Sequence, residues 1–211
     1  MQTVTELALD NAPRGVFTRG EAGCWSNAEG ARLDGLLKRA VAHGEVWRLR
    51  RELYVLHPRY LRRTVEPFAL AQRIHGPSYV SMESALAWHG AIPEAVYTIT
   101  SVTQARSRTF DTELGVFFFT RVPQKVLYRD VTRHNADDGA FFIAQPLKAL
   151  TDYIYAHDCR WTTLQEAIES LRLDDEVLRG TTQETIDGLL SNYAAGNVRK
   201  FLQALRRECK P

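Results

Sequence analysis

Positively charged side chains that could bind phosphate are concentrated between residues 27 and 51 of this chain of 211 residues. Arginine and lysine donate charge-assisted hydrogen bonds to phosphate oxygens, and asparagine can pair with a base edge. This combination is typical of a surface that binds nucleic acid. The candidate residues for such contacts are Asn27, Arg32, Lys38, Arg39, Arg48, Arg50 and Arg51.

The sequence gives much less support for catalysis or metal binding. The chain has no Gly-rich phosphate loop, no GxSxG and no HExxH sequence, and its six histidines lack metal-ligand spacing. The acidic runs 137–138 and 174–176 offer carboxylates for a metal ion, but acids in such loops more often cap helices. We therefore predict no catalytic residue, cofactor or metal. A site around His89 and Asp152 is the enzymatic alternative.

A predicted helix over residues 26–43 would present the first four candidates. Ser26 and Glu29 have the spacing of a capping box, in which each side chain bonds the other residue's backbone amide, and they predict the start of the helix. Gly44 is expected just after its end, in the left-handed conformation that glycine adopts freely. The apolar side of the helix is predicted to comprise Leu33, Leu36, Leu37, Ala40 and Val41.

The opposite side of this helix combines small residues with cations. Small side chains would let the backbone enter the major groove of DNA while the longer polar side chains reach bases and phosphates. A solvated face, with alanine present for its helix propensity, is the alternative interpretation. The small residues expected at the centre of this side are Ala28, Ala31, Gly35 and Ala42.

Two β-prone runs after the helix, residues 46–49 and 53–56, predict a hairpin with a basic turn. In that hairpin Arg48, Arg50 and Arg51 would hold phosphates or enter the minor groove. Shorter helices are expected earlier, at 3–11 and about 19–23, with a second capping box at Thr18 and Glu21 and a short buried stretch at 16–17. Three helices and a hairpin predict a winged helix-turn-helix domain over residues 1–63.

Charge is distributed unevenly although the formal net charge is only +2. Residues 1–63 carry 11 Lys and Arg against 7 Asp and Glu, whereas residues 64–211 carry 16 against 18. The basic excess therefore lies with the proposed nucleic-acid surface. No apolar run approaches the length of a membrane span, no secretory signal opens the chain, and the odd, scattered cysteines fit a reducing compartment. We expect a cytoplasmic protein with no membrane contact.

Residues 64–211 predict a larger mixed domain, so that the whole chain is α+β with two domains. Its first half has β-prone runs that suggest a small antiparallel meander, and its second half is helical. The strands are expected at 96–102, 108–110, 116–120 and 141–144. The helices are expected at 66–75, 84–90, 146–157, 162–171, 182–192 and 195–208.

Residues 79–123, taken with 141–155, resemble the AbiEi-like antitoxins of bacterial type IV toxin–antitoxin systems. The motifs that carry the resemblance are a Ser-Ala-Leu helix ending in His-Gly, a Thr-Ser-Val strand end, an Arg-x-Arg-Thr-Phe strand and a Pro-x-Lys-Ala-Leu-x-Asp helix start. The order and spacing of both domains match as well. One departure is Glu52, which stands where the family often has glycine.

The resemblance implies an autorepressor that binds inverted repeats in double-stranded DNA at its own promoter. It also implies an antitoxin that counteracts a nucleotidyltransferase-like toxin without a stable complex. Two alternatives stay open: a plain winged-helix transcriptional regulator, and a winged helix used for protein contacts, with the second domain binding the toxin directly.

Overall fold

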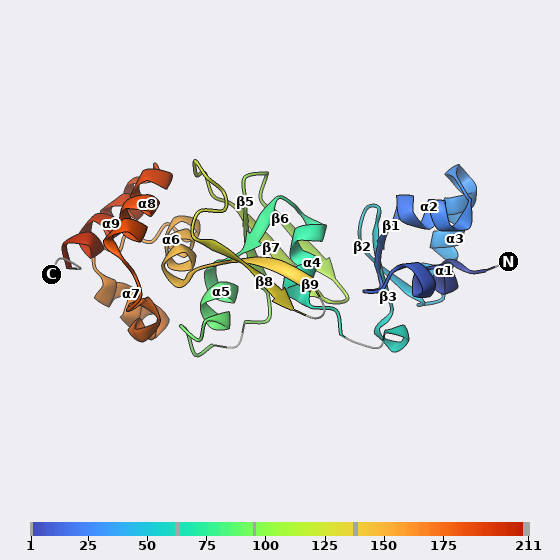
Figure 1. Ribbon diagram of the computed structural model, residues 1–211, viewed down its shortest axis with the longest axis horizontal. Helices are drawn as coiled ribbons and strands as arrows, with labels where there is room; N and C mark the ends of the chain where they lie inside the picture. Colours follow the sequence, from blue (N-terminus) through green and yellow to red (C-terminus); the bar gives the residue numbers. More distant parts are fainter. Residues whose placement is uncertain (1, 62–63, 95, 137–138, 209–211) are drawn as a thin grey trace.

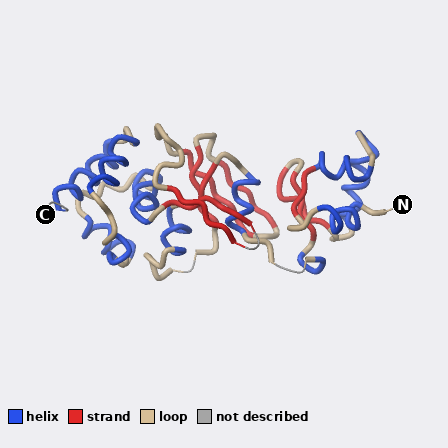
Figure 2. The backbone as a smooth tube through the Cα atoms, in the orientation of Figure 1, coloured by secondary structure: helices blue, strands red, loops and turns tan. Residues whose placement is uncertain are grey.

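The computed structural model describes residues 2–61, 64–94, 96–136 and 139–208. It is an α+β structure that contains a three-stranded antiparallel sheet and a six-stranded mixed sheet (Figure 1). The three-stranded sheet lies between the first helices and the six-stranded sheet, and the last helices lie at the far end of the molecule (Figure 2). None of the helices in the described ranges is both long and apolar enough for a bilayer crossing.

The first part of the chain has the predicted inventory of helices and strands. Thr18 and Glu21 form the predicted capping box, and the same arrangement occurs at Thr3 and Glu6. Gly44 has the predicted left-handed conformation, with a φ of +64°. The elements are α1 (Val4–Asn11), β1 (Val16–Thr18), α2 (Arg19–Ser26), α3 (Gly30–Ala42), β2 (Val46–Arg50), β3 (Leu53–Leu56) and the short 3-10 helix η1 (Pro58–Tyr60).

The predicted start of the third helix is wrong. Ser26 is the last residue of α2, where its hydroxyl donates to the carbonyl of Ala22, and Glu29 precedes α3 without a side-chain cap. Because the chain turns between the two helices, Ala28 is buried in the core under them instead of lying on the outward side. Val41, predicted to be inward, is exposed.

The three-stranded sheet has the order β1-β3-β2, and its hairpin contains a β-bulge. Arg48 pairs with Tyr54, but Arg50 pairs with Leu53, so one extra residue is inserted between these pairs. Side chains alternate between the two faces of a regular strand, and a bulge interrupts that alternation. Arg48 therefore shares the helix-covered face with Tyr54, whereas Arg50 shares the opposite face with Leu53.

The second sheet is larger than predicted, and it is mixed rather than antiparallel. The hairpin of β6 and β7 was predicted, but β5 pairs with β7 in parallel, so these strands do not form a meander. Two further strands, β4 and β8, were missed, and the order is β6-β7-β5-β4-β9-β8. The strands are β4 (Ser78–Val80), β5 (Ile99–Thr103), β6 (Arg108–Thr112), β7 (Gly115–Arg121), β8 (Val131–Ala136) and β9 (Gly139–Ala144).

Helices cover both faces of this sheet, with α4 on one face and α5 and α6 on the other (Figure 1). The predicted helices of this part are all present, and the predicted apolar side of the last one is buried. They are α4 (Pro67–Ile74), α5 (Met82–Trp88), α6 (Pro146–Ala156), α7 (Leu164–Leu171), η2 (Asp175–Leu178), α8 (Gln183–Asn192) and α9 (Gly196–Glu208).

The two parts of the chain share an apolar core. One face of the three-stranded sheet packs on α1–α3, and the other packs against α4 and the six-stranded sheet. Burial of apolar surface is the main favourable contribution to such packing. Residues 62–63, at the predicted boundary between the domains, lie outside the described ranges. The shared core comprises Val16, Leu49, Leu53, Val55, Leu70, Ala71, Ile74, Ile99, Phe117 and Phe119.

Candidate functional site

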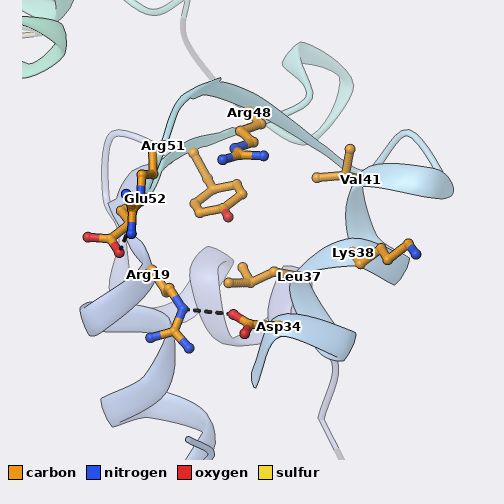
Figure 3. Close-up of a pocket in the computed structure, with 9 residues that line it drawn as sticks. Arg19, Asp34, Leu37, Lys38, Val41, Arg48, Arg51 and Glu52 are labelled. Atoms are coloured by element: carbon orange, nitrogen blue, oxygen red, sulfur yellow. Dashed lines mark hydrogen bonds and ion pairs between the residues drawn. The ribbon is translucent and has the colours of Figure 1, made fainter. Parts of the chain in front are cut away.

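A groove of about 630 Å³ lies between α3 and the β2–β3 hairpin (Figure 3). The buried side chains of Leu37 and Tyr54 contribute apolar surface to it, and the exposed Val41 lies at its side. Charged groups of both signs complete the lining. They are Arg19, Asp34, Lys38, Arg48, Arg51 and Glu52.

The helix and the hairpin position these cations by burying their apolar neighbours. Leu33, Leu37 and Ala40 anchor α3 in the core, which leaves Lys38 exposed. Arg48 is exposed on the hairpin strand β2, and its Nε donates weakly to the Arg50 carbonyl at 3.4 Å. Lys38 makes no hydrogen bond or ion pair within the described ranges. It is therefore free to bind an anionic partner.

Arg19 is a groove residue that sequence reasoning missed. Its Nε lies 2.8 Å from Asp34, and this hydrogen bond raises the pKa of the Arg19 guanidinium. Its backbone amide donates to the Glu52 carbonyl, which ties the start of α2 to the hairpin turn. A cation in the first turn of a helix opposes the helix dipole. That unfavourable position was the available signal that Arg19 has a partner elsewhere.

The β2–β3 turn has strained geometry at Glu52. Its φ is +63°, in the left-handed region that favours glycine, where the resemblance also expects glycine. Arg51 is highly exposed, and its Nε lies 4.0 Å from the Glu52 carboxylate. An ion pair this exposed contributes little free energy, so the Arg51 side chain can reorient toward a ligand.

The remaining candidates of the helix side are exposed but lie outside the groove. Arg32 and Arg39 project from α3 and make no hydrogen bond or ion pair in the described part of the chain. Asn27 is the left-handed C-cap of α2, with a φ of 47°. Since asparagine tolerates this conformation well, the turn itself gives a structural reason for Asn27.

Arg50 is separated from the other arginines of the hairpin. Its Nη1 donates to the Arg51 carbonyl at 2.8 Å, and its Nη2 donates to the Arg73 carbonyl on α4 at 3.1 Å. Its Nε is buried without a partner. The bulge that turns Arg50 to this face thus commits its guanidinium to contacts inside the protein.

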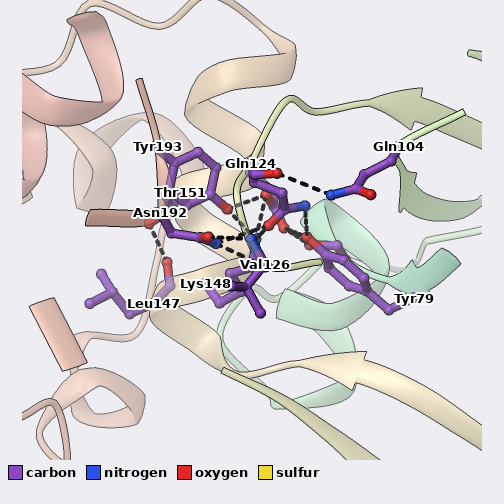
Figure 4. A network of polar contacts seen from close by, with 11 residues as sticks. Tyr79, Gln104, Gln124, Val126, Leu147, Lys148, Thr151, Asn192 and Tyr193 are labelled. Carbon is purple, nitrogen blue, oxygen red and sulfur yellow. Dashed lines mark hydrogen bonds and ion pairs between the residues drawn. The ribbon is translucent and has the colours of Figure 1, made fainter. Parts of the chain in front are cut away.

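The enzymatic alternative draws on Asp152, which bonds to Lys148 and Tyr193 in a buried polar network of the second part. Figure 4 shows Lys148 and Tyr193 in this network. Lys148 and Asp152 form an ion pair at 3.0 Å, and both side chains have no exposed surface. Asp152 also accepts hydrogen bonds from Tyr79 at 2.8 Å and from Ser81 at 2.7 Å, and Tyr193 binds both charged groups. A carboxylate with this many partners and no exposure cannot meet a substrate in this conformation.

Burial also shifts the pKa values of the titratable groups in this network. Removal from water raises the pKa values of Tyr79 and Tyr193 well above 10, and the negative charge of Asp152 adds to both shifts. Burial lowers the pKa of Lys148, and the attraction of Asp152 opposes that shift. Because both tyrosines stay neutral, they remain hydrogen-bond donors to the carboxylate.

The remaining residues proposed for catalysis or metal binding either contact neighbouring parts of the chain or lie outside the described ranges. His89 Nε2 lies 2.9 Å from the Ala144 carbonyl, burial lowers its pKa, and no hydrogen bond or ion pair in the described ranges joins it to Asp152. Asp174 caps η2, as expected for an acid in a loop. Residues 137–138 lie outside the described ranges. Among the described residues, no group of histidine, cysteine and acidic side chains has an arrangement that could hold a metal ion.

Comparison with models of known protein families and with curated proteins gives no match for this chain.

Proposed function

We propose that residues 2–61, the described part of the domain predicted over 1–63, form a winged helix-turn-helix that binds double-stranded DNA, with α3 in the major groove and the β2–β3 hairpin as the wing. The support is the order of three helices and a hairpin, with α2 and α3 joined by a tight turn. The observation that carries the proposal is the groove between α3 and the hairpin, which Lys38 lines from the helix and Arg48 and Arg51 line from the hairpin.

The charge balance of this surface supports contact with phosphates. Arg19 is neutralised by Asp34 inside the groove, so Lys38, Arg48 and Arg51 supply the usable positive charge, and Arg32 and Arg39 extend it along α3. Phosphate contacts set the affinity and position of a protein on the duplex. Arg32, Lys38 and Arg39, which have no partner in the described ranges, can make such contacts without losing a hydrogen bond, and the contacts of Arg48 and Arg51 are weak ones at the surface.

The DNA proposal is tested by fluorescence anisotropy with a labelled duplex from upstream of the protein's own coding sequence and a shuffled duplex. Lys38→Ala should weaken binding and reduce the slope of log affinity against log salt by about 0.9. Arg133→Ala, which removes an exposed cation from β8 at the other end of the large sheet, is the matched control. Absence of wild-type binding at low salt would overturn the proposal.

We further propose that the chain is an AbiEi-like antitoxin that represses its own operon and counteracts a nucleotidyltransferase-like toxin. This proposal depends on the resemblance of residues 79–123 and 141–155 and on the DNA proposal for the first part. Its test is co-expression with the toxin encoded next to it, with growth as the readout. Wild-type protein and Lys38→Ala should both restore growth, because neutralisation is assigned to the second part. Failure of the wild-type protein would refute the antitoxin proposal.

A second candidate is a winged helix that binds protein. The observation that favours it is the mixed lining of the groove, in which Leu37, Val41, Asp34 and Glu52 lie beside the cations. In that case Lys38→Glu should abolish co-purification with the toxin and leave DNA affinity unchanged. The opposite result supports DNA as the partner.

A further inference from the structure

We propose that the second part of the chain extends the DNA-binding surface, through a phosphate contact made by Arg108 on β6 beside the wing. This inference rests on the proposed DNA-binding function of the first part. It gives a role to the Arg-x-Arg-Thr-Phe strand, which lies far from α3 in the sequence.

A second cleft, of about 400 Å³, lies on the other side of the wing turn. Arg51 and Glu52 line both this cleft and the groove beside α3, so the turn separates the two and borders each of them. The opposite wall of the cleft consists of Arg108 and Phe110 from β6 and His75 from the end of α4. A DNA backbone that follows α3 and the wing would next meet this wall.

The register of the large sheet fixes the direction of Arg108. Arg108 pairs with Phe119 and Phe110 pairs with Phe117, and both pairs lie on the face that packs against the three-stranded sheet. Phe117 and Phe119 are buried there, whereas Arg108 is exposed at the rim. Its side chain makes no hydrogen bond or ion pair in the described part of the chain, so its charge is available to a phosphate.

The wall opposite the wing is held in place on both sides. His75 Nε2 lies 3.0 Å from the carbonyl of Arg106, just before β6, and its ring packs against Phe110 and Phe119. Across the cleft, Arg50 binds the Arg73 carbonyl on α4, the helix that ends just before His75. These contacts hold the β2–β3 turn and the start of β6 on opposite sides of one cleft. The backbones that carry Arg51 and Arg108 therefore need not rearrange for both side chains to reach one anion, which lowers the cost of binding.

The test compares Arg108→Ala, Arg108→Lys and the control Arg133→Ala by anisotropy on the upstream duplex and on a random-sequence duplex. Arg108→Ala should bind about tenfold more weakly on both duplexes, as expected for one charge-assisted hydrogen bond, with a salt slope smaller by about 0.9. Arg108→Lys should retain the slope, and Arg133→Ala should match wild type. Thermal unfolding should be unchanged in all three, because both side chains are exposed.

The outcomes separate this inference from the proposed function. If Lys38→Ala weakens binding and Arg108→Ala does not, the inference is wrong and the DNA-binding proposal stands; Arg108 then only protects an edge strand from pairing with another sheet. If wild-type protein binds neither duplex, both the inference about Arg108 and the DNA-binding proposal are wrong. If Arg108→Ala leaves DNA binding intact but abolishes co-purification with the toxin, the cleft is a protein surface and the inference is again overturned.

Discussion

The guanidinium of Arg50 donates to the backbone carbonyl of Arg73 at 3.1 Å, and the guanidinium of Arg73 donates to the carbonyl of Val16 at the same distance. Arg73 also lies 3.9 Å from the carboxylate of Glu21. Each arginine therefore reaches from one part of the chain to the backbone of the other. Together with the shared apolar core, this reciprocal pair fixes the β2–β3 hairpin against α4 and the large sheet.

Arg50→Ala should lower the free energy of unfolding by about 1–2 kcal/mol, because hydrogen bonds from a charged donor to two carbonyls are lost at a partly buried site. The measurement is urea unfolding with an unchanged slope. Arg51→Ala is the control, since Arg51 is highly exposed, and it should keep the wild-type midpoint while weakening DNA binding. If Arg50→Ala instead lost affinity at full stability, Arg50 would be a DNA contact.

Glu52→Gly should stabilise the protein by about 0.5–1 kcal/mol, because it relieves the left-handed strain at the cost of a more flexible unfolded chain. It should also strengthen DNA binding, because it removes a carboxylate from the groove. Glu52→Ala removes the same charge and keeps the strain, so it should share the gain in affinity and not the gain in stability. Equal stability of the two variants in thermal unfolding would contradict the strain argument.

Asn27→Gly should keep wild-type stability, because glycine fits the left-handed turn between α2 and α3, whereas Asn27→Ala should lose about 1 kcal/mol. If Asn27 also contacts a base, Asn27→Gly should reduce the preference for the upstream duplex over a shuffled one. Anisotropy on both duplexes measures this preference. An unchanged preference would leave Asn27 with its conformational role alone.

Asp152→Asn should lower the free energy of unfolding by about 3–5 kcal/mol, because it leaves the buried charge of Lys148 without its counter-charge. Loss of toxin neutralisation in that variant would therefore say nothing about catalysis. His89→Ala is the informative variant, since His89 is only partly buried, and it should neutralise fully while remaining folded. A folded His89→Ala protein without neutralising activity would revive the enzymatic alternative.

Stability should fall as the pH rises above about 10. The pKa values of Tyr79 and Tyr193 are raised on folding, so their contribution is fully present below the unfolded value of 10.0 and is lost above it. Each tyrosine can contribute a slope of up to about 1.4 kcal/mol per pH unit. The lowered pKa of Lys148 has the opposite effect below pH 10.5. The unfolded chain binds that proton more strongly there, so stability rises with pH.

Urea midpoints measured from pH 8 to 11 at constant ionic strength would test this pH dependence. In Tyr193→Phe the decline above pH 10 should be less steep, since one of the buried tyrosines with a raised pKa is gone. An identical decline in that variant would show that other groups govern alkaline unfolding.

Local signals in the sequence were sufficient to predict most individual helices and strands. The Thr18–Glu21 capping box, Gly44 and the β2–β3 hairpin depend on residues close together in the chain, and the structure agrees with each prediction. The Ser26–Glu29 spacing failed because Ser26 had a competing partner, the carbonyl of Ala22, one turn earlier in the preceding helix. From the sequence alone, Ser26 could belong either to the end of α2 or to the start of α3, and packing selects the first.

The arrangement of the proposed DNA-binding surface was decided by tertiary structure. The parallel pairing of β5 with β7 joins strands that another strand separates in the sequence, so no local pattern encodes it. A single inserted residue in β2 turns Arg50 from the groove to α4, and packing of the two parts brings Arg108 beside Arg51. The sequence by itself determined which residues are cationic and which elements carry them. Which cations share a surface depends on strand register and on contacts between distant segments, and only the folded chain fixes those.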